Sequence, residues 1–506
     1  MSQKKMYDLM DEYSLRNPEK KSLVYEQKYL TYKQLSHFSD ILAQAIVSQG
    51  FQKGQRAALY LEKSLESIVC MLAIQKAGGI YVPLDYSQPY NRINFILENC
   101  DVSLLFLREK KKTNLGKELL PAKATELLVW IGDAFQEKES FFQIENLSGT
   151  TKASPNQEDL VFLLYTSGST GVPKGVKISR QNAQVFVDWC LEEMELKEED
   201  VFLSLAGFHF DLSVFDIYCS LSVGATLVLY PDYGMINPNQ ICHCIDSCKV
   251  SVVYTVPSML TLWISSQAID KHSLDTLHYV LFAGEVFPIK YLRQIKDRLP
   301  NTRFYNLYGP TETNVCTYYE VKKISPDRQD PVPIGKAVKG ATIYALNEAQ
   351  NPIQEGETGE LYVTGPCVTP GYWNLYNPEN TENHKKGIHA TGDIVSLEEG
   401  NFVFRGRRDN QIKWQGFRIE LGEIEKVLLL HPGVKECTVL FHPEPQPGKM
   451  IAYIAPHGLS PILLREHCSK SLPKYMIPHS FLFYEKLPKN SNGKIDKIAI
   501  IQSFIA

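Results

Sequence analysis

The segment Tyr165-Thr166-Ser167-Gly168-Ser169-Thr170-Gly171-Val172-Pro173-Lys174-Gly175 directly follows the apolar run 160–164. Its small hydroxyl residues and three glycines allow backbone N–H and side-chain O–H groups to converge on phosphate oxygens. Lys174 adds a positive point charge. No Gly-Lys-Ser/Thr follows at the Walker A spacing, so this would be a different kind of phosphate loop. Taken alone, the segment is equally consistent with a flexible surface turn.

Apolar strands and amphipathic helices alternate on both sides of this segment. Strands are expected at 57–61, 80–84, 201–206, 226–230, 250–255 and 279–283, with helices at 64–76, 214–221 and 258–266. This alternation is typical of α/β layers with largely parallel sheets. Between about residues 331 and 406, short strands are separated by Gly, Pro and Asn turns, which indicates a small β subdomain.

A smaller domain is expected after Gly406-Arg407-Arg408-Asp409, with helices at 420–430 and 460–471 and strands at 438–441 and 450–455. We therefore predict an α/β fold. A large N-terminal domain, 1–408, would contain two α/β layered subdomains and a small β-barrel-like subdomain. A small mobile α+β domain, 409–506, would follow a short hinge at Asp409.

Composition excludes several classes of protein. The net charge of -4 gives no strong field for nucleic acid or anionic membranes, and no run of about 18 apolar residues could span a bilayer. The N-terminus lacks an apolar signal core, and eleven cysteines lack a disulfide framework, so we expect a cytoplasmic protein with reduced thiols. Cys242-His243-Cys244 with Cys248 could suggest a metal site, but without paired C-x-x-C spacing inert thiols are favoured.

Further motifs follow the glycine-rich loop in a fixed order. They are Asn306-Leu307-Tyr308-Gly309-Pro310-Thr311-Glu312, Gly359-Glu360-Leu361, Gly371-Tyr372, Thr391-Gly392-Asp393, Gly406-Arg407-Arg408-Asp409 continuing to Gly416-Phe417-Arg418-Ile419-Glu420, and Asn492-Gly493-Lys494-Ile495-Asp496. Together with the loop, these seven motifs resemble those of the adenylate-forming enzymes, a family that includes amino-acid adenylation domains, acyl-CoA synthetases and luciferases. The resemblance covers nearly the whole chain.

The resemblance implies that a carboxylate attacks the α-phosphate of ATP and releases pyrophosphate. Charge neutralisation and positioning must supply most of the catalysis, because the nucleophile is weak and the phosphate is negative. The implied nucleotide contacts are Tyr308 and Asn306 on adenine, Asp393 and Arg407 on ribose, Thr311 on the α-phosphate, Glu312 on Mg²⁺, and Thr166, Ser167, Gly168, Thr170 and Lys174 on the other phosphates.

The implied catalytic lysine is Lys494, which would contact both the substrate carboxylate and the transferring phosphate. For the second half-reaction, thioester formation, rotation about Asp409 would withdraw Lys494 and present the loop at Gly416 to the acceptor thiol. Without the resemblance, Asp393 would be interpreted as an ordinary turn residue and Lys494 as a solvated surface residue.

The segment Phe210-Asp211-Leu212-Ser213-Val214-Phe215-Asp216 resembles the substrate motif of the amino-acid branch. Asp211 would pair with the substrate ammonium while Lys494 pairs with its carboxylate. The alternative is that Asp211 caps the helix that starts at Leu212. The remaining implied pocket residues, all apolar except one threonine, are Leu212, Phe215, Thr255, Leu281, Ala283, Leu307, Val315 and Cys316. Such a pocket should reject polar side chains and accept a small apolar amino acid.

This residue set is similar to that of free-standing L-prolyl adenylating enzymes, which load a separate phosphopantetheinylated carrier protein in pathways that convert proline to a pyrrole or related ring. The nearest alternative is the D-alanine–carrier protein ligases, which usually carry Cys at the position of Ala283. An acyl-CoA synthetase would not need Asp211, and a non-catalytic nucleotide-binding scaffold would not need Lys494. Because no carrier motif follows Lys494, we expect the carrier in trans.

Overall fold

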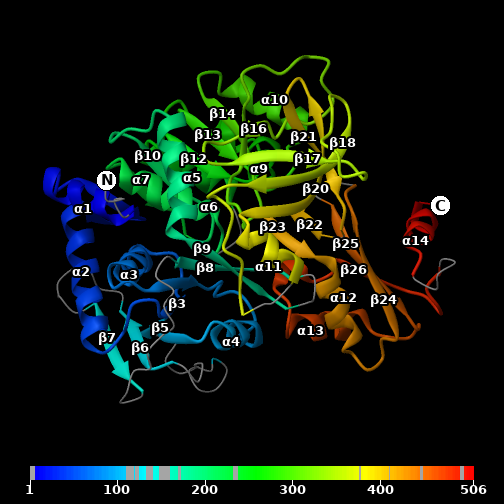
Figure 1. Cartoon of the computed structure of the whole chain (residues 1–506), viewed down its shortest axis with the longest axis horizontal. Coiled ribbons are helices and arrows are strands. Elements are labelled where there is room, and N and C mark those ends of the chain that lie inside the picture. The colour runs from blue at the N-terminus through cyan, green and yellow to red at the C-terminus, as the bar shows by residue number, and fades with distance from the viewer. Residues whose placement is uncertain are drawn as a thin grey trace. The chain divides into compact units, whose positions relative to one another are not determined.

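The structure is a computed structural model of the chain (Figure 1), and it describes residues 6–109, 119, 125–132, 141–147, 160–168, 172–231, 237–374, 378–409, 411–444, 448–489 and 495–505. The chain divides into two compact units. Unit 1 contains Met1–Tyr86, Leu97–Leu164 and Gly175–Arg408, and unit 2 contains Ser87–Ile96, Tyr165–Lys174 and Asp409–Ala506.

A nine-stranded sheet with a parallel centre belongs to unit 1. Its strands, in spatial order, are β16 (Lys336–Ala337), β15 (Thr317–Glu320), β14 (Arg303–Tyr308), β13 (Tyr279–Phe282), β12 (Val252–Thr255), β10 (Val201–Ser204), β11 (Thr226–Leu229), β1 (Lys21–Tyr25) and β2 (Lys28–Thr31). The strands from β14 to β1 are parallel, whereas β15, β16 and β2 pair antiparallel at the edges. The central strands are rich in Val, Leu and Phe because both faces of a parallel sheet are covered.

A second, eight-stranded sheet carries the glycine-rich loop. Its strands are β19 (Tyr372–Trp373), β9 (Lys174–Ser179), β8 (Leu160–Thr166), β4 (Ile80–Pro83), β3 (Arg56–Tyr60), β5 (Val102–Arg108), β6 (Leu127–Ile131) and β7 (Phe142–Asn146). The strand expected at 160–164 extends to Thr166, so the loop begins at Ser167.

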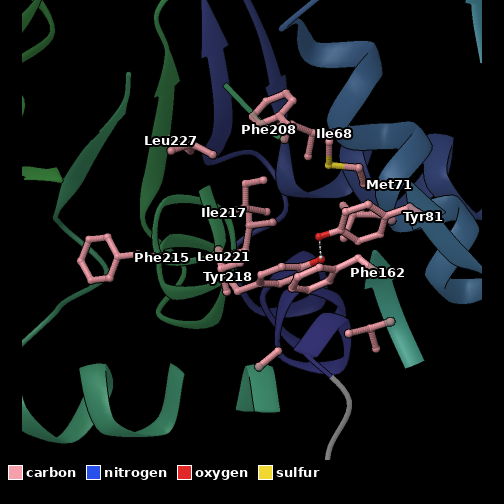
Figure 2. Close-up of a cluster of buried hydrophobic side chains, with 14 of the residues drawn as sticks. Ile68, Met71, Tyr81, Phe162, Phe208, Phe215, Ile217, Tyr218, Leu221 and Leu227 are labelled. Atoms are coloured by element: carbon pink, nitrogen blue, oxygen red, sulfur yellow. Dashed lines mark hydrogen bonds between the residues drawn. The ribbon is translucent and has the colours of Figure 1, made fainter. Parts of the chain in front are cut away.

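Helix α3 (Leu65–Lys76) contacts strands of both large sheets. Ser64 and Ser67 form a capping box at its start, and nearly every residue of the helix is buried. Figure 2 shows Ile68 and Met71 of this helix beside Tyr81 of β4. The other helical segments are α1 (Met6–Arg16), α2 (Tyr32–Ser48), α4 (Tyr90–Asn99), α5 (Arg180–Glu193), α6 (Leu212–Val214), the π-helix η2 (Phe215–Cys219), α7 (Ser220–Ser222), α8 (Pro238–Cys248), α9 (Pro257–Ser265), η3 (Ala268–Asp270), α10 (Ile289–Arg298) and α11 (Pro378–Lys385).

A four-stranded antiparallel sheet completes the sheets of unit 1. It consists of β17 (Thr342–Leu346), β18 (Thr358–Thr364), β20 (Ile388–Glu398) and β21 (Asn401–Arg407). Tyr344 and Tyr362 stack across β17 and β18 with ring centroids 5.4 Å apart. The register of β20 and β21 places Asp393 opposite Arg407.

Unit 2 has its own apolar core and an α+β arrangement. Its C-terminal part contains β22 (Gln411–Trp414), β23 (Phe417–Glu420), α12 (Leu421–Leu429), β24 (Glu436–His442), β25 (Lys449–Ala455), α13 (Pro461–Ser469), η4 (Lys474–Met476), β26 (Ser480–Phe483) and α14 (Lys497–Ile505). Strands β22 and β23 form a hairpin whose turn residues, Gln415 and Gly416, both have positive φ angles, 50° and 81°. Within the described ranges, no helix is long and apolar enough to cross a bilayer.

Candidate functional site

Four of the predicted substrate residues lie at or near the carboxyl ends of β12, β13 and β14, namely Thr255, Leu281, Ala283 and Leu307. Thr255 ends β12 and lies in register with Phe282 of β13, which lies in register with Asn306 of β14. The Ala283 N–H donates to the Thr255 carbonyl at 3.2 Å. The carboxyl edge of a parallel sheet is the usual place for a ligand in open α/β folds.

Most of the predicted pocket side chains belong to one continuous apolar cluster. Phe215, Leu281, Ala283, Leu307 and Val315 are buried members of this cluster, and Leu212 packs against it. Cys316 differs, because its side chain belongs to the cluster around the four-stranded sheet. Its backbone N–H donates to the Tyr308 carbonyl at 2.8 Å. The Cys316 side chain therefore packs with residues of the four-stranded sheet, while its neighbour Val315 packs with the other pocket residues.

Asp211 directly precedes Leu212, which packs against this apolar cluster. It occupies the N-cap position of α6, but its side chain makes no capping hydrogen bond and its backbone is helical, with φ -66° and ψ -19°. Helix capping is therefore not the role of its carboxylate. Burial, and then the charge of Asp211, raise the pKa of Tyr254, the residue before Thr255. The Asp211 charge thus acts on a residue of β12.

A π-helix directs the side chains that follow Asp211. Phe215 begins it and packs against Phe202 and Tyr254, with ring centroids 5.6 Å from each. Tyr218, three residues on, hydrogen-bonds the Tyr81 hydroxyl at 3.0 Å, and Figure 2 shows its ring pointing in a different direction from that of Phe215. An extra residue in a helical turn redirects the side chains around it, a feature frequent at functional sites.

Two predicted nucleotide residues converge on a third, Asp393, which is buried in β20. Tyr308 of β14 donates its hydroxyl to Oδ2, and Arg407 of β21 donates from Nη1 to Oδ1. The Asp393 N–H donates to Thr391 Oγ1 at 3.0 Å. Burial, and then the charge of Asp393, raise the pKa of Tyr308 well above its usual value, so the phenol stays protonated as a donor.

The turn after β14 carries Thr311 and Glu312. Gly309 opens it and cannot bear a side chain, because a Cβ there would lie 1.6 Å from the Asn314 carbonyl oxygen. Asn314 has a positive φ of 52°, which bends the chain back toward β15. At the end of β14, Asn306 donates its amide to the Pro333 carbonyl at 2.7 Å, so the amide orientation is fixed.

Glu312 has no exposed surface. Its Oε1 accepts a hydrogen bond from the Tyr372 hydroxyl at 2.8 Å, and its carbonyl accepts from the Thr369 N–H at 2.7 Å. Across the described part of the chain, no group of three or more His, Cys, Asp or Glu could hold a metal ion. Mg²⁺ bound through one carboxylate, substrate phosphates and waters needs no such group, so Glu312 fits that ion.

The glycine-rich loop belongs to unit 2. Ser167 donates its hydroxyl to the Arg418 carbonyl at 2.7 Å. A Cβ on Gly168 would lie 2.1 Å from the Val172 carbonyl oxygen, so only glycine fits there. The Thr166 hydroxyl is buried and has no hydrogen-bond partner, and Lys174 begins β9. Thr170 lies outside the described residues.

The predicted hinge and thiolation residues also belong to unit 2. Asp409 is its first residue after Arg408, and Asp409 Oδ1 accepts the Gln411 N–H at 3.2 Å. Gly416 occupies the β22–β23 turn. Lys494 lies outside the described residues, so its predicted role stays a prediction.

Sequence reasoning missed the buried Lys63, whose charge acts on Asp216 in the Asp211 segment. Lys63 donates to the carbonyls of Ser204 and Leu205 at 3.2 and 3.0 Å, at the end of β10. Burial raises the pKa of Asp216 to about 8, while the charge of Lys63 acts in the opposite direction. The available signal was Asp216 within the apolar run 214–217, whereas Lys63 stands between Glu62 and Ser64 and gave no such signal.

Comparison with known proteins assigns the family. The AMP-binding enzyme family matches residues 10–373, and its C-terminal domain family matches 423–494. The L-proline–(L-prolyl-carrier protein) ligase of Streptomyces coelicolor is 40% identical over 483 residues, which cover 92% of this chain and 91% of the relative. The ligase of the same name from Pseudomonas fluorescens is 36% identical over 493 residues, covering 96% of each chain.

A solved structure has the same fold. The Vibrio cholerae adenylation domain AlmE, in complex with glycyl-adenosine-5'-phosphate, aligns with a TM-score of 0.82 and 23% identity, covering 99% of this chain and 97% of that chain. The predicted α/β fold class and the resemblance to adenylate-forming enzymes are thus confirmed. The chain belongs to the AMP-binding enzyme family and is an ATP-using ligase.

Proposed function

We propose that this enzyme activates L-proline with ATP and transfers the prolyl group to the phosphopantetheine thiol of a separate carrier protein. The observation that carries the proposal is one carboxylate, Asp211, which makes no capping hydrogen bond and directly precedes Leu212, a residue packed against the apolar cluster that contains Leu281, Ala283 and Leu307. The two relatives match this chain along nearly their whole length. Their names support L-proline as the amino acid and a carrier protein as the acceptor.

Recognition of the amino acid depends on one charge and on apolar packing. Asp211 pairs with the secondary ammonium of proline. The side chains of Phe215, Leu281, Ala283 and Leu307 offer no hydrogen bonds, so a polar substrate side chain would lose its hydration without compensation. Thr255 Oγ1, at the end of β12, is the one polar side-chain group in the predicted pocket wall.

The nucleotide is bound around Asp393. Each carboxylate oxygen has a second lone pair beyond the bonds to Tyr308 and Arg407, and these accept the ribose hydroxyls. Asn306 donates one of its two amide N–H groups to the Pro333 carbonyl, and its acceptor, Oδ1, suits the exocyclic amine of adenine. The ring of Tyr308 stacks on the base.

The phosphates and Mg²⁺ complete the ATP site. Glu312 holds Mg²⁺, which neutralises phosphate charge when it is bound. Thr311 contacts the α-phosphate. The phosphate loop, consisting of Thr166, Ser167, Gly168, Thr170 and Lys174, holds the other phosphates, and the buried Thr166 hydroxyl is a ready donor for them.

The reaction has two steps. A proline carboxylate oxygen bonds to the α-phosphorus while the bond to the pyrophosphate oxygen breaks, and Lys494 stabilises the shifting negative charge. The carrier thiolate then attacks the acyl carbon, and AMP leaves. Between the steps the domain 409–506 turns about Asp409 relative to the domain 1–408, which withdraws Lys494 and presents Gly416.

Amino-acid-dependent exchange of labelled pyrophosphate into ATP tests the proposal. The panel contains L-proline, D-alanine, L-alanine, glycine and propionate. We expect exchange to be strongest with L-proline. Exchange with D-alanine alone would overturn L-proline as the substrate and indicate D-alanine instead. Exchange with propionate would indicate an acyl-CoA synthetase. Transfer of labelled L-proline to a phosphopantetheinylated carrier tests the second step. We expect no transfer to the apo carrier, which lacks the thiol.

A further inference from the structure

We propose that Tyr372 is a positioning residue for Glu312, and that it links this carboxylate to β9, the strand that follows the phosphate loop. The inference rests on the proposed function, in which Glu312 holds Mg²⁺. Tyr372 lies 60 positions from Glu312 in the chain, so only the fold brings the two together.

The contact is a hydrogen bond between a phenol and a buried carboxylate. Tyr372 donates to Glu312 Oε1 at 2.8 Å, and Glu312 is fully buried. A hydrogen bond to a charged acceptor is stronger than one between neutral groups and restricts the carboxylate orientation. Residues that hydrogen-bond a metal ligand orient it and tune its affinity for the metal.

Tyr372 is itself held by the second sheet. It belongs to β19, where it pairs antiparallel with Val176 of β9, and the Lys177 N–H donates to the Gly371 carbonyl at 3.0 Å. The Tyr372 ring packs edge-on against the buried His384 ring, with centroids 5.4 Å apart. The phenol is therefore positioned by contacts with β9 and α11 in addition to its bond to Glu312.

Thr369 makes a parallel link from the same segment. Its N–H donates to the Glu312 carbonyl at 2.7 Å, while its buried hydroxyl donates to the Lys177 carbonyl. Both the backbone and the side chain of Glu312 are thus tied to residues 369–372, and these are tied to β9. A shift of β9 is transmitted to Glu312, so metal affinity depends on this connection.

The test is Tyr372→Phe in the full chain, which removes the hydroxyl and keeps the ring against His384. Binding of Mn²⁺ to the complex with a non-hydrolysable ATP analogue is measured by the loss of the free-ion electron-paramagnetic signal, without turnover. We expect the apparent Kd for Mn²⁺ to rise about tenfold or more, as for other groups that support a metal ligand. Binding of metal-free AMP should be unchanged.

The matched control is Tyr362→Phe. Tyr362 is a partly buried tyrosine whose hydroxyl lies 3.5 Å from another carboxylate, Glu360 Oε2, on β18. Removal of the Tyr362 hydroxyl should leave the affinity for Mn²⁺ unaltered. A second variant, Thr369→Val, removes the hydroxyl link to β9 and should weaken Mn²⁺ binding in the same direction. Thermal melting verifies that each variant is folded.

The outcomes separate this inference from the proposed function. Unchanged Mn²⁺ affinity in Tyr372→Phe, with a large loss in Glu312→Gln, overturns the positioning role alone. Unchanged affinity in Glu312→Gln overturns the metal assignment of the proposed function. Equal losses of Mn²⁺ and metal-free AMP binding in Tyr372→Phe also overturn the inference, because they would show general damage to the site.

Discussion

The Tyr308 hydroxyl donates a hydrogen bond to Asp393 across 85 residues of chain, and Arg407 holds the other oxygen of the same carboxylate. Asp393 is therefore oriented before any nucleotide binds. Preorganisation of this kind reduces the free-energy cost of ordering the site when a ligand arrives.

Asp393→Asn should raise the KM for ATP by about 10- to 100-fold, because hydrogen bonds to a charged group contribute about 1.5–3 kcal/mol each. The amide also cannot accept at both positions, so Arg407 loses its partner. Initial rates of pyrophosphate exchange at varied ATP measure the effect. The control is Asp188→Asn, on the exposed face of α5. Equal KM values for ATP in the two variants would contradict the ribose assignment.

Asp211→Asn should raise the KM for L-proline by about 100-fold, since removal of one partner of a desolvated charge pair costs about 2–5 kcal/mol. The KM for ATP should change little, because Asp211 lies on the segment after β10 and not in the Asp393 cluster. Exchange kinetics with each substrate varied in turn provide both constants. A parallel rise in both would indicate that Asp211 supports the fold of the site.

Lys494→Ala should reduce adenylation by at least about 100-fold, because a positioned charge is lost from the transition state. Transfer from chemically prepared prolyl-adenylate to the carrier should be far less affected, since the proposed mechanism withdraws Lys494 in that step. Single-turnover measurements of the two half-reactions make the comparison. An equal loss in both would exclude the two-conformation mechanism.

Asp216 should make stability depend on pH. Burial raises its pKa from 3.8 to about 8 in the folded chain, so the folded state retains a proton that the unfolded state releases. This contribution is fully present below pH 3.8 and is lost as pH rises through 8, by at most about 1.4 kcal/mol per pH unit. Between pH 6 and 8, the Tm of the wild type should therefore fall more than that of Asp216→Asn. Parallel curves for the two proteins would show that Asp216 does not titrate in this range.

Local signals in the sequence were enough to predict several elements closely. The helix expected at 64–76 is α3, Leu65–Lys76, because Ser64 supplies a cap and a Gly-Gly pair ends the pattern. The strands expected at 250–255 and 279–283 are β12 and β13, because their apolar runs can be buried on both faces. The order of the seven motifs predicted the family, since each motif is a short segment that can be recognised without knowing which distant residues it contacts.

The sequence alone determined the alternation of strands and helices, the family and the residue types available for the chemistry. Tertiary structure decided which of those residues meet: Tyr308 with Asp393, Tyr372 with Glu312, and Cys316 in a different cluster from Leu281. It also decided the π-turn at Phe215 and the burial of Lys63. Helix and strand periodicity are properties of neighbouring residues. A hydrogen bond between strands depends on sheet order and register, which arise only when distant segments pack together.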